Sequence, residues 1–218
     1  MELKGKKIAF LGDSITEGVG PSTLDNVYWK VLERNTGALC FGFGVGGSRM
    51  AVNRVPSPNP AFDQNFVSRA DDLIDDADVV VVFGGVNDFA HGDAPFGCHD
   101  DRTEETFCGA VHVLMEKLLA RYPYGQTVFM TPLHCEFEDE VGMNPYGVRR
   151  CANLETYVNA IMEAAAFYGI PVLDLFRTSS IQPRVPFNKQ LNMPDGIHPN
   201  DAGNLRIAGR LEGFLRSL

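Results

Sequence analysis

One uninterrupted apolar run constrains the fold more than any other part of this sequence. Residues 78–83 read Asp-Val-Val-Val-Val-Phe, without a polar residue between Val79 and Phe83. A strand with one face in water alternates apolar and polar side chains, whereas a strand covered on both faces does not. The run therefore predicts a strand of a parallel sheet that is packed between layers of helices.

The rest of the chain alternates short apolar segments with amphipathic ones. Further strands are predicted at residues 8–11, 38–43, 126–131 and 171–175. Apolar side chains at helical spacing predict helices over residues 25–35, 62–74, 103–121, 147–168 and 201–215. This alternation predicts an α/β fold, a three-layer α/β/α sandwich around a five-stranded, mostly parallel sheet. The chain has 218 residues and no linker or internal repeat, so we expect a single domain over residues 1–218.

The charge balance excludes several classes of partner. The net charge is −9, and Lys4, Lys6 and Lys7 merely flank the first strand, so we expect no nucleic-acid or anionic-membrane partner.

The five cysteines form no Cys-x-x-Cys pair, which suits reduced thiols better than a disulfide framework. No apolar run is long enough for a signal peptide or a membrane span, which favours a cytoplasmic location. The sequence leaves the oligomeric state open.

Unusual stretches follow the predicted strands at the carboxyl ends, where an open parallel sheet binds its ligands. Gly12-Asp13-Ser14 follows the first strand, residues 44–47 follow the second, and residues 84–88 follow the third. Asp195 and His198 come after the fifth strand, beyond a long loop at residues 176–194. A structureless loop of that length is uncommon in a compact domain, so it indicates a functional segment or a hidden short element.

Asp195 and His198 have the spacing of half a catalytic triad. Three residues apart on a short turn, the carboxylate can hold one nitrogen of the imidazole while the other nitrogen faces outward. The missing nucleophile is predicted to be Ser14, because a serine hydroxyl reacts at neutral pH only beside a base. A simpler explanation for Ser14 is a polar turn residue or a helix cap ahead of Glu17.

Acyl transfer also requires hydrogen-bond donors for the developing oxyanion. A glycine loop after a buried strand can present backbone N–H groups at close range, and Gly47 is the predicted donor there. The backbone N–H of Ser14 and the side-chain amide of Asn87 are the other two candidates. Gly46 and Gly47 are alternatively a tight turn, and Asn87 is alternatively a turn residue bonded to its own backbone.

Other motifs are absent or fit poorly. One loop carries a group of potential metal ligands, namely His91, Asp93, His99, Asp100 and Asp101. Their spacing matches no zinc pattern, so we expect a solvated acidic loop and no metal. Gly42, Gly44 and Gly47 match a dinucleotide-binding spacing, but they follow the second strand, and prolines break any helix after them. No Gly-x-Ser-x-Gly elbow and no phosphate-binding loop occur, and no cofactor is expected.

Four short blocks together resemble the SGNH, or GDSL-type, hydrolase family. They are Gly12-Asp13-Ser14-Ile15, Gly47, Gly85-Val86-Asn87-Asp88 and Asp195-Gly196-Ile197-His198, in the family's order. The resemblance implies a flavodoxin-like fold and ester hydrolysis. It also implies Ser14 as nucleophile, His198 as base, Asp195 as its partner, and Gly47 and Asn87 as oxyanion donors. Ile15 replaces the usual Leu, and Gly42 stands where the second block usually has Asn, so Gly46 remains an alternative to Gly47.

Together, these features predict a serine esterase that hydrolyses a small or carbohydrate-linked O-acyl ester, most simply an O-acetyl group. Several loop aromatics could reach a substrate there and stack on a sugar or an acyl chain, or could equally pack in the core, namely Phe89, Phe96, Phe137, Tyr146 and Phe187. A lysophospholipase or thioesterase of the same family is the alternative among hydrolases. A non-catalytic binding module with this fold, or a flavodoxin- or receiver-like signalling domain, are the competing classes, although the latter leaves Asp195 and His198 unexplained.

Overall fold

The sheet is parallel and five-stranded, as the sequence predicts. The computed structural model describes residues 1–144, 147 and 149–218. The sheet strands are β1 (Lys7–Gly12), β2 (Leu39–Gly44), β3 (Val79–Phe83), β4 (Gln126–Met130) and β7 (Val172–Leu173). Their order is β2-β1-β3-β4-β7, and every neighbouring pair is parallel. This is the flavodoxin-like order, in which the chain reverses its direction of winding beside β1 and β3.

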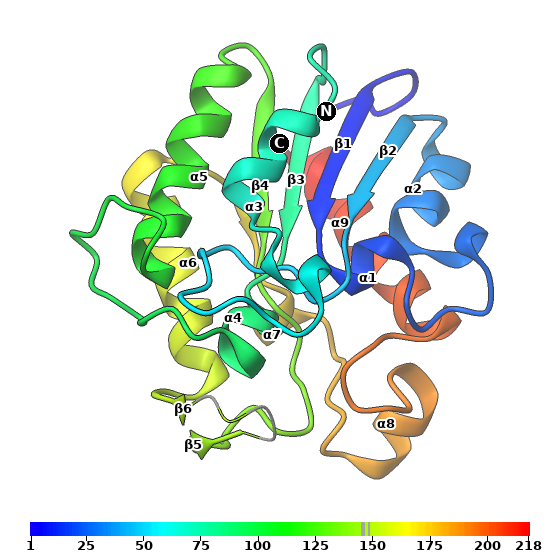
Figure 1. The fold of residues 1–218 in the computed structure, drawn as a ribbon. Coiled ribbons are helices and arrows are strands. Elements are labelled where there is room, and N and C mark those ends of the chain that lie inside the picture. Colours follow the sequence, from blue (N-terminus) through cyan, green and yellow to red (C-terminus); the bar gives the residue numbers. More distant parts are fainter. Residues whose placement is uncertain (145–146, 148) are drawn as a thin grey trace.

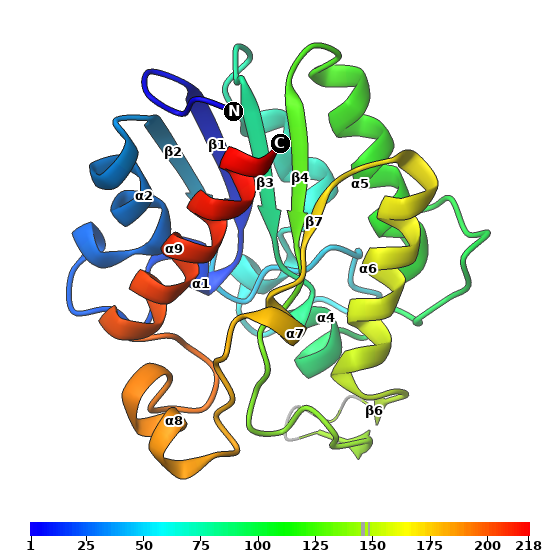
Figure 2. The ribbon, with the colours of Figure 1, turned by 180° about the vertical axis from the view of Figure 1, so that it is seen from behind.

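Helices cover both faces of the sheet (Figures 1 and 2). On one face lie α3 (Phe66–Arg69), α5 (Phe107–Arg121) and α6 (Leu154–Tyr168), and on the other lie α2 (Tyr28–Thr36) and α9 (Asp201–Ser217). The apolar run of β3 divides between the two sides. Val80 and Val82 belong to the core under α5 and α6, whereas Val79, Val81 and Phe83 belong to the core under α2 and α9. The missing alternation in the sequence thus reflects a strand buried on both faces.

The helix predicted at residues 62–74 is wrong as a continuous element. The chain instead forms a 3₁₀ turn (Pro60–Asp63), the short α3 and a second 3₁₀ turn (Ala70–Asp72). The break falls at Asn65, whose backbone is extended and whose side chain accepts the N–H of Ser68 at 2.8 Å. Asn65 therefore caps a new helix rather than continuing an old one. Phe66, Ala70 and Leu73 still reach the core, so the apolar pattern identified the buried side correctly.

Helix α6 starts later than the helix predicted at residues 147–168. It begins at Leu154 instead of residue 147, because Asn153 caps it by accepting the N–H of Thr156 at 3.1 Å. Upstream, β5 (Gly142–Met143) and β6 (Arg149–Arg150) form a small antiparallel sheet. The end of α6 is as expected, at Gly169 in a left-handed conformation with φ of 68°.

Short helices occupy the loops at the carboxyl ends of the strands. The turn α1 (Ser14–Glu17) follows β1, and α4 (Val86–His91) follows β3 in a segment for which the sequence predicts no helix. The long segment after β7 contains α7 (Leu175–Thr178) and α8 (Pro186–Asn192), the hidden short elements that its length indicated. In the described part of the chain, no helix has the combination of length and apolar content that crossing a bilayer requires.

Candidate active site

Ser14 is the first residue of α1, directly beyond the end of β1. The strand turns sharply into the helix because Gly12 has no side chain, and a Cβ there would lie 1.9 Å from Oγ1 of Thr16. Asp13 caps the turn, since its carboxylate accepts the N–H of Ile15 at 3.0 Å. Burial raises the pKa of this Asp13 carboxyl to about 6. The turn therefore fixes the backbone that presents the Ser14 hydroxyl.

The structure brings Ser14, His198 and Asp195 into one hydrogen-bonded row. Oγ of Ser14 lies 3.0 Å from Nε2 of His198, although the two residues are 184 positions apart in the chain. Nδ1 of His198 lies 2.7 Å from Oδ2 of Asp195. This is the arrangement in which a carboxylate holds the imidazole with its proton on Nδ1 and leaves Nε2 to accept the serine proton.

Asp195 is held by the turn that it belongs to. Its Oδ1 accepts the backbone N–H groups of Ile197 at 2.9 Å and His198 at 2.7 Å. Partial burial favours the neutral acid, but these bonds and the contact with His198 outweigh burial, so the pKa of Asp195 is lowered. Gly196 takes a φ of 84°, which only glycine adopts readily, and so lets four residues close this turn. Asp195 is therefore a charged carboxylate at neutral pH.

The loop after β2 places Gly46 and Gly47 at the wall of the same cavity as Ser14. The N–H of Gly46 is bonded to Oε2 of Glu17 at 2.9 Å. Among the described residues, no acceptor is bonded to the N–H of Gly47. Gly47 has a φ of 73°, and a Cβ there would lie 2.0 Å from the ring of Phe62. Of the two glycines left open by the sequence, Gly47 is thus the one with an uncommitted amide.

Asn87 also lines this cavity, and hydrogen bonds at both the nitrogen and the oxygen of its side-chain amide fix its orientation. Nδ2 donates to the carbonyl of Ser48 at 3.0 Å, and Oδ1 lies 3.2 Å from Nε2 of His91. Nδ1 of His91 accepts from Nε of Arg49 at 3.2 Å, so the His91 proton is on Nε2 and is donated to Asn87. Burial, followed by the charge of Arg49, lowers the pKa of His91 to about 4 and keeps the ring neutral.

His91 and Arg49 are the residues of this site that sequence reasoning missed. His91 lies one helical turn after Asn87 in α4, but no sequence pattern indicated that helix, and His91 was considered only as a possible metal ligand. Nothing in the sequence connects Arg49 to it. Asp88 has a structural task nearby, because its carboxylate accepts the N–H groups of Met50 and Ala51, both at 3.0 Å, and burial raises its pKa to about 6. Gly85, with φ of 108°, is the N-cap of α4.

The cavity at Ser14 has a volume of about 690 Å³ and mixed walls. Besides the residues above, the walls contain Glu17, Val19, Asn59, Phe62, Phe137, Glu140 and Arg150. The Arg150 guanidinium lies 4.8 Å from the ring centre of Phe137 and is bonded to Glu140 at 2.9 Å.

The aromatic residues expected near the substrate have different positions. Phe137 lines the cavity, and Phe89 is buried behind it with ring centres 6.0 Å apart. Phe96 lines a different cavity, and Phe187 is exposed on α8. Tyr146 lies outside the described residues.

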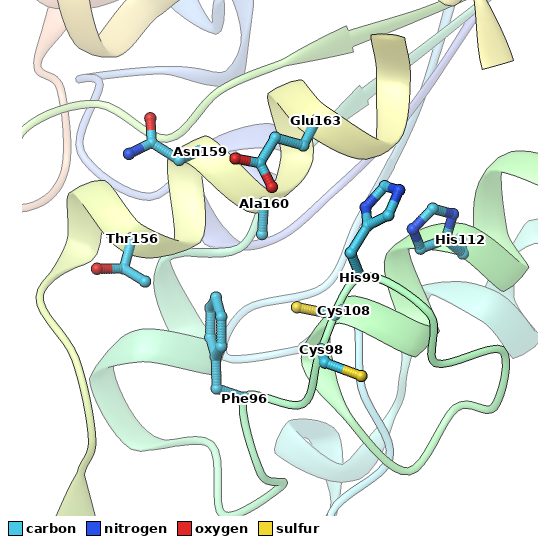
Figure 3. Close-up of a pocket in the computed structure, with 9 residues that line it drawn as sticks. All are labelled: Phe96, Cys98, His99, Cys108, His112, Thr156, Asn159, Ala160 and Glu163. Carbon is cyan, nitrogen blue, oxygen red and sulfur yellow. The ribbon is translucent and has the colours of Figure 1, made fainter. Parts of the chain in front are cut away.

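A separate cavity of about 270 Å³ lies between residues 96–99, α5 and α6 (Figure 3). Cys98, His99, Cys108, His112 and Glu163 are among its lining residues, and none of the triad candidates is. In the part of the chain that the structure describes, no three or more His, Cys, Asp or Glu side chains are arranged to hold a metal ion.

Two carboxylates of the acidic loop at residues 91–101 are hydrogen-bonded within the protein. Asp93 accepts the N–H groups of Arg54 and Val55, both at 2.8 Å, and Asp101 accepts from Cys98 and Thr106. Asp93 therefore connects this loop to residues 54–55, and Asp101 bonds within the loop and to the cap of α5.

Comparison with known proteins gives a consistent result. The model of the GDSL-like Lipase/Acylhydrolase family matches residues 10–206. A crystal structure of a Lactobacillus plantarum protein is 31% identical, with a TM-score of 0.81 and 98% of each chain covered. A possible lipase from Chitinophaga pinensis is 22% identical, with a TM-score of 0.72 over 97% of this chain and 98% of that one. An acetyl xylan esterase, AlAXEase, is 21% identical, with a TM-score of 0.66 over 95% and 98%. No curated protein matches.

Proposed function

Since this chain belongs to the GDSL-like lipase and acylhydrolase family, whose members act on esters, we propose that it is a serine carboxylesterase. Its substrate is a small or carbohydrate-linked O-acyl ester, most simply an O-acetyl ester. One observation carries the proposal. The row from Asp195 through His198 to Ser14, with distances of 2.7 and 3.0 Å, opens on the same cavity that Gly47 and Asn87 line.

The reaction starts with Ser14. Its oxygen attacks the ester carbonyl while Nε2 of His198 takes the hydroxyl proton, and the Asp195 carboxylate stabilises the imidazolium that forms. The carbonyl oxygen becomes an oxyanion, which accepts hydrogen bonds from the amides of Ser14 and Gly47 and from Nδ2 of Asn87. His198 then donates the proton to the departing alcohol. In the second half, His198 removes a proton from water, the hydroxide attacks the acyl-enzyme, and the acid leaves as Ser14 regains its proton.

The cavity walls support a polar alcohol in the substrate. Glu17, Glu140 and Arg150 line the cavity beside Phe62 and Phe137, and this mixture of charged groups and flat apolar rings suits a hydroxylated ring. A long acyl chain instead requires continuous apolar surface. The acetyl xylan esterase AlAXEase shares this fold at 21% identity.

An active-site-directed fluorophosphonate tests the nucleophile. We expect it to label the wild-type protein and not Ser14→Ala, while the control Ser217→Ala, at an exposed serine in α9, labels as wild type does. Absence of labelling in the wild type, or equal labelling of Ser14→Ala, would favour a non-catalytic binding module instead.

The acyl preference needs its own experiment. Hydrolysis of p-nitrophenyl esters from acetyl to decanoyl should be fastest with acetyl or the next shortest chains. A maximum at the long chains would contradict the acetyl assignment and favour a lysophospholipase or thioesterase.

A further inference from the structure

A further cavity, of about 280 Å³ and distinct from the one in Figure 3, adjoins the candidate active site. Asn59, Phe62 and His91 line both this cavity and the one that contains Ser14. The other walls come mainly from the loop at residues 53–58, with Arg49 and Asp93. The Phe62 ring lies against Gly47 and has its centre 5.1 Å from that of His91. This cavity therefore shares a wall with the one in which we propose that the ester is bound.

Two polar atoms of this wall lack a partner. Arg49 is 3% exposed; its Nε donates to His91 at 3.2 Å and its Nη2 donates to Oγ of Ser57 at 3.1 Å. Asn53 donates through Nδ2 to the same Ser57 oxygen at 3.0 Å and to Asp63 at 2.8 Å. Within the described residues, neither Nη1 of Arg49 nor Oδ1 of Asn53 has a hydrogen-bond partner, and both atoms are buried.

The shared bond to Ser57 shows that these two side chains are neighbours. An N–H donor and a carbonyl acceptor thus remain unsatisfied on two neighbouring side chains that line this cavity. Buried polar groups are nearly always bonded, and those that are not call for a specific partner. Val55, Pro56 and Pro58 add apolar surface to the wall, and Asn59 and Asp93 add further polar groups. The wall therefore combines polar groups with apolar surface.

Hydroxyl groups are the ligand groups that fit this pair, because a hydroxyl oxygen can accept from Arg49 and a hydroxyl hydrogen can be donated to Asn53. An alkyl chain would satisfy neither atom. A carboxylate would satisfy Arg49 but repel the Asn53 carbonyl and the carboxylates of Asp63 and Asp93 nearby. We propose that this cavity is the subsite for the alcohol part of the ester, and that it selects an uncharged polyhydroxylated ring such as a sugar. The subsite deepens the proposed esterase function and rests on it.

A matched pair of substrates tests the subsite. Methyl 6-O-acetyl-glucopyranoside and cyclohexylmethyl acetate share a six-membered ring and an acetylated CH₂O group, but only the first has ring hydroxyls. We expect the wild-type kcat/KM to favour the sugar ester by about 10- to 100-fold, since a site built for a hydroxyl discriminates strongly against an analogue without one. Val55→Trp, which fills the cavity, should reduce this ratio about tenfold. Val185→Trp, at a half-exposed valine that lines neither cavity, should keep the wild-type ratio.

The outcomes separate the subsite from the activity. Equal kcat/KM values for the two esters, or a ratio that Val55→Trp leaves intact, would overturn the subsite while the esterase stands. If neither ester is hydrolysed and the fluorophosphonate does not label, the esterase fails, and calorimetric titration of Ser14→Ala with methyl 6-O-acetyl-glucopyranoside then decides the subsite. Binding that the added Val55→Trp change weakens about tenfold supports it, and absence of binding overturns it.

Discussion

Oδ1 of Asn87 and Nε2 of His91 lie 3.2 Å apart, one turn from each other on α4. Because Arg49 donates to the other ring nitrogen, the His91 proton is directed at Asn87. The side-chain oxygen of Asn87 is thereby held by His91, and the NH₂ group of Asn87 faces the Ser48 carbonyl and the cavity. His91 is thus a positioning residue for the proposed oxyanion donor, and it does not itself contact the reacting atoms.

This relationship predicts the effect of removing the His91 ring. His91→Ala should lower kcat by about 10- to 100-fold and leave KM nearly constant, because the mobile Asn87 amide loses part of its transition-state bond. His91→Gln keeps an N–H donor on the same helical turn and should recover part of the loss. Steady-state kinetics on p-nitrophenyl acetate measures both variants.

A double-mutant cycle distinguishes positioning from general damage. Asn87→Ala alone should cost about 100- to 1000-fold in kcat. If His91 acts through Asn87, then adding His91→Ala to Asn87→Ala should cost little more. Multiplicative losses in the double variant would show that His91 acts by another route.

Gly47 allows a separate test of the proposed oxyanion hole. Gly47→Ala places a Cβ 2.0 Å from the Phe62 ring at a φ of 73°, so the loop has to shift, and we expect kcat to fall by about 100-fold or more. Gly5→Ala is the matched control, since Gly5 has a φ of 75° and a Cβ there would have none of the described atoms within 4 Å. Circular dichroism melting curves measure the loss of folding stability that a positive φ causes for alanine in both variants. Similar kcat values for the two variants would remove Gly47 from the proposed oxyanion hole.

The sequence predicted the sheet because its signal is simple: β3 is apolar throughout, and only a strand covered on both faces is built that way. The contact between Ser14 and His198 was also predictable, since parallel topology brings the carboxyl ends of the strands to one edge. Helix starts were less predictable, because Asn65 and Asn153 set them through side-chain bonds that apolar periodicity does not contain. The support of Asn87 by Arg49 through His91 was not predictable, because it depends on how loops pack, and loop packing produces no periodic pattern in the sequence.

Asp195 provides a test of the tautomer argument. Asp195→Asn keeps an oxygen that can accept the two backbone N–H groups, but its NH₂ group faces Nδ1 of His198. The ring proton is then moved to Nε2, where it blocks acceptance of the Ser14 proton. We expect kcat to fall by about 100- to 10,000-fold. Asp201→Asn is the control, because Asp201 also accepts two hydrogen bonds, both from Ser22, away from the triad. Equal losses in the two variants would contradict a role for Asp195 in orienting His198.

The lowered pKa of His91 predicts a pH-dependent part of the folding stability. The ring titrates near its ordinary pKa of about 6.5 when unfolded and at about 4 when folded, so between these values the unfolded chain binds the extra proton. The stability that the neutral ring contributes is complete above pH 6.5 and is lost as the pH falls toward 4. At pH 5 the loss is at most about 2 kcal/mol. Urea denaturation at pH 7.5 and pH 5 gives the free energy of unfolding of wild type and of His91→Gln. Subtracting one protein's value from the other's at each pH cancels the opposite contributions of Asp13 and Asp88, which both proteins share. The advantage of the wild type over His91→Gln should shrink by about 1–2 kcal/mol at pH 5, and a constant advantage would show that His91 is not held neutral by its burial beside Arg49.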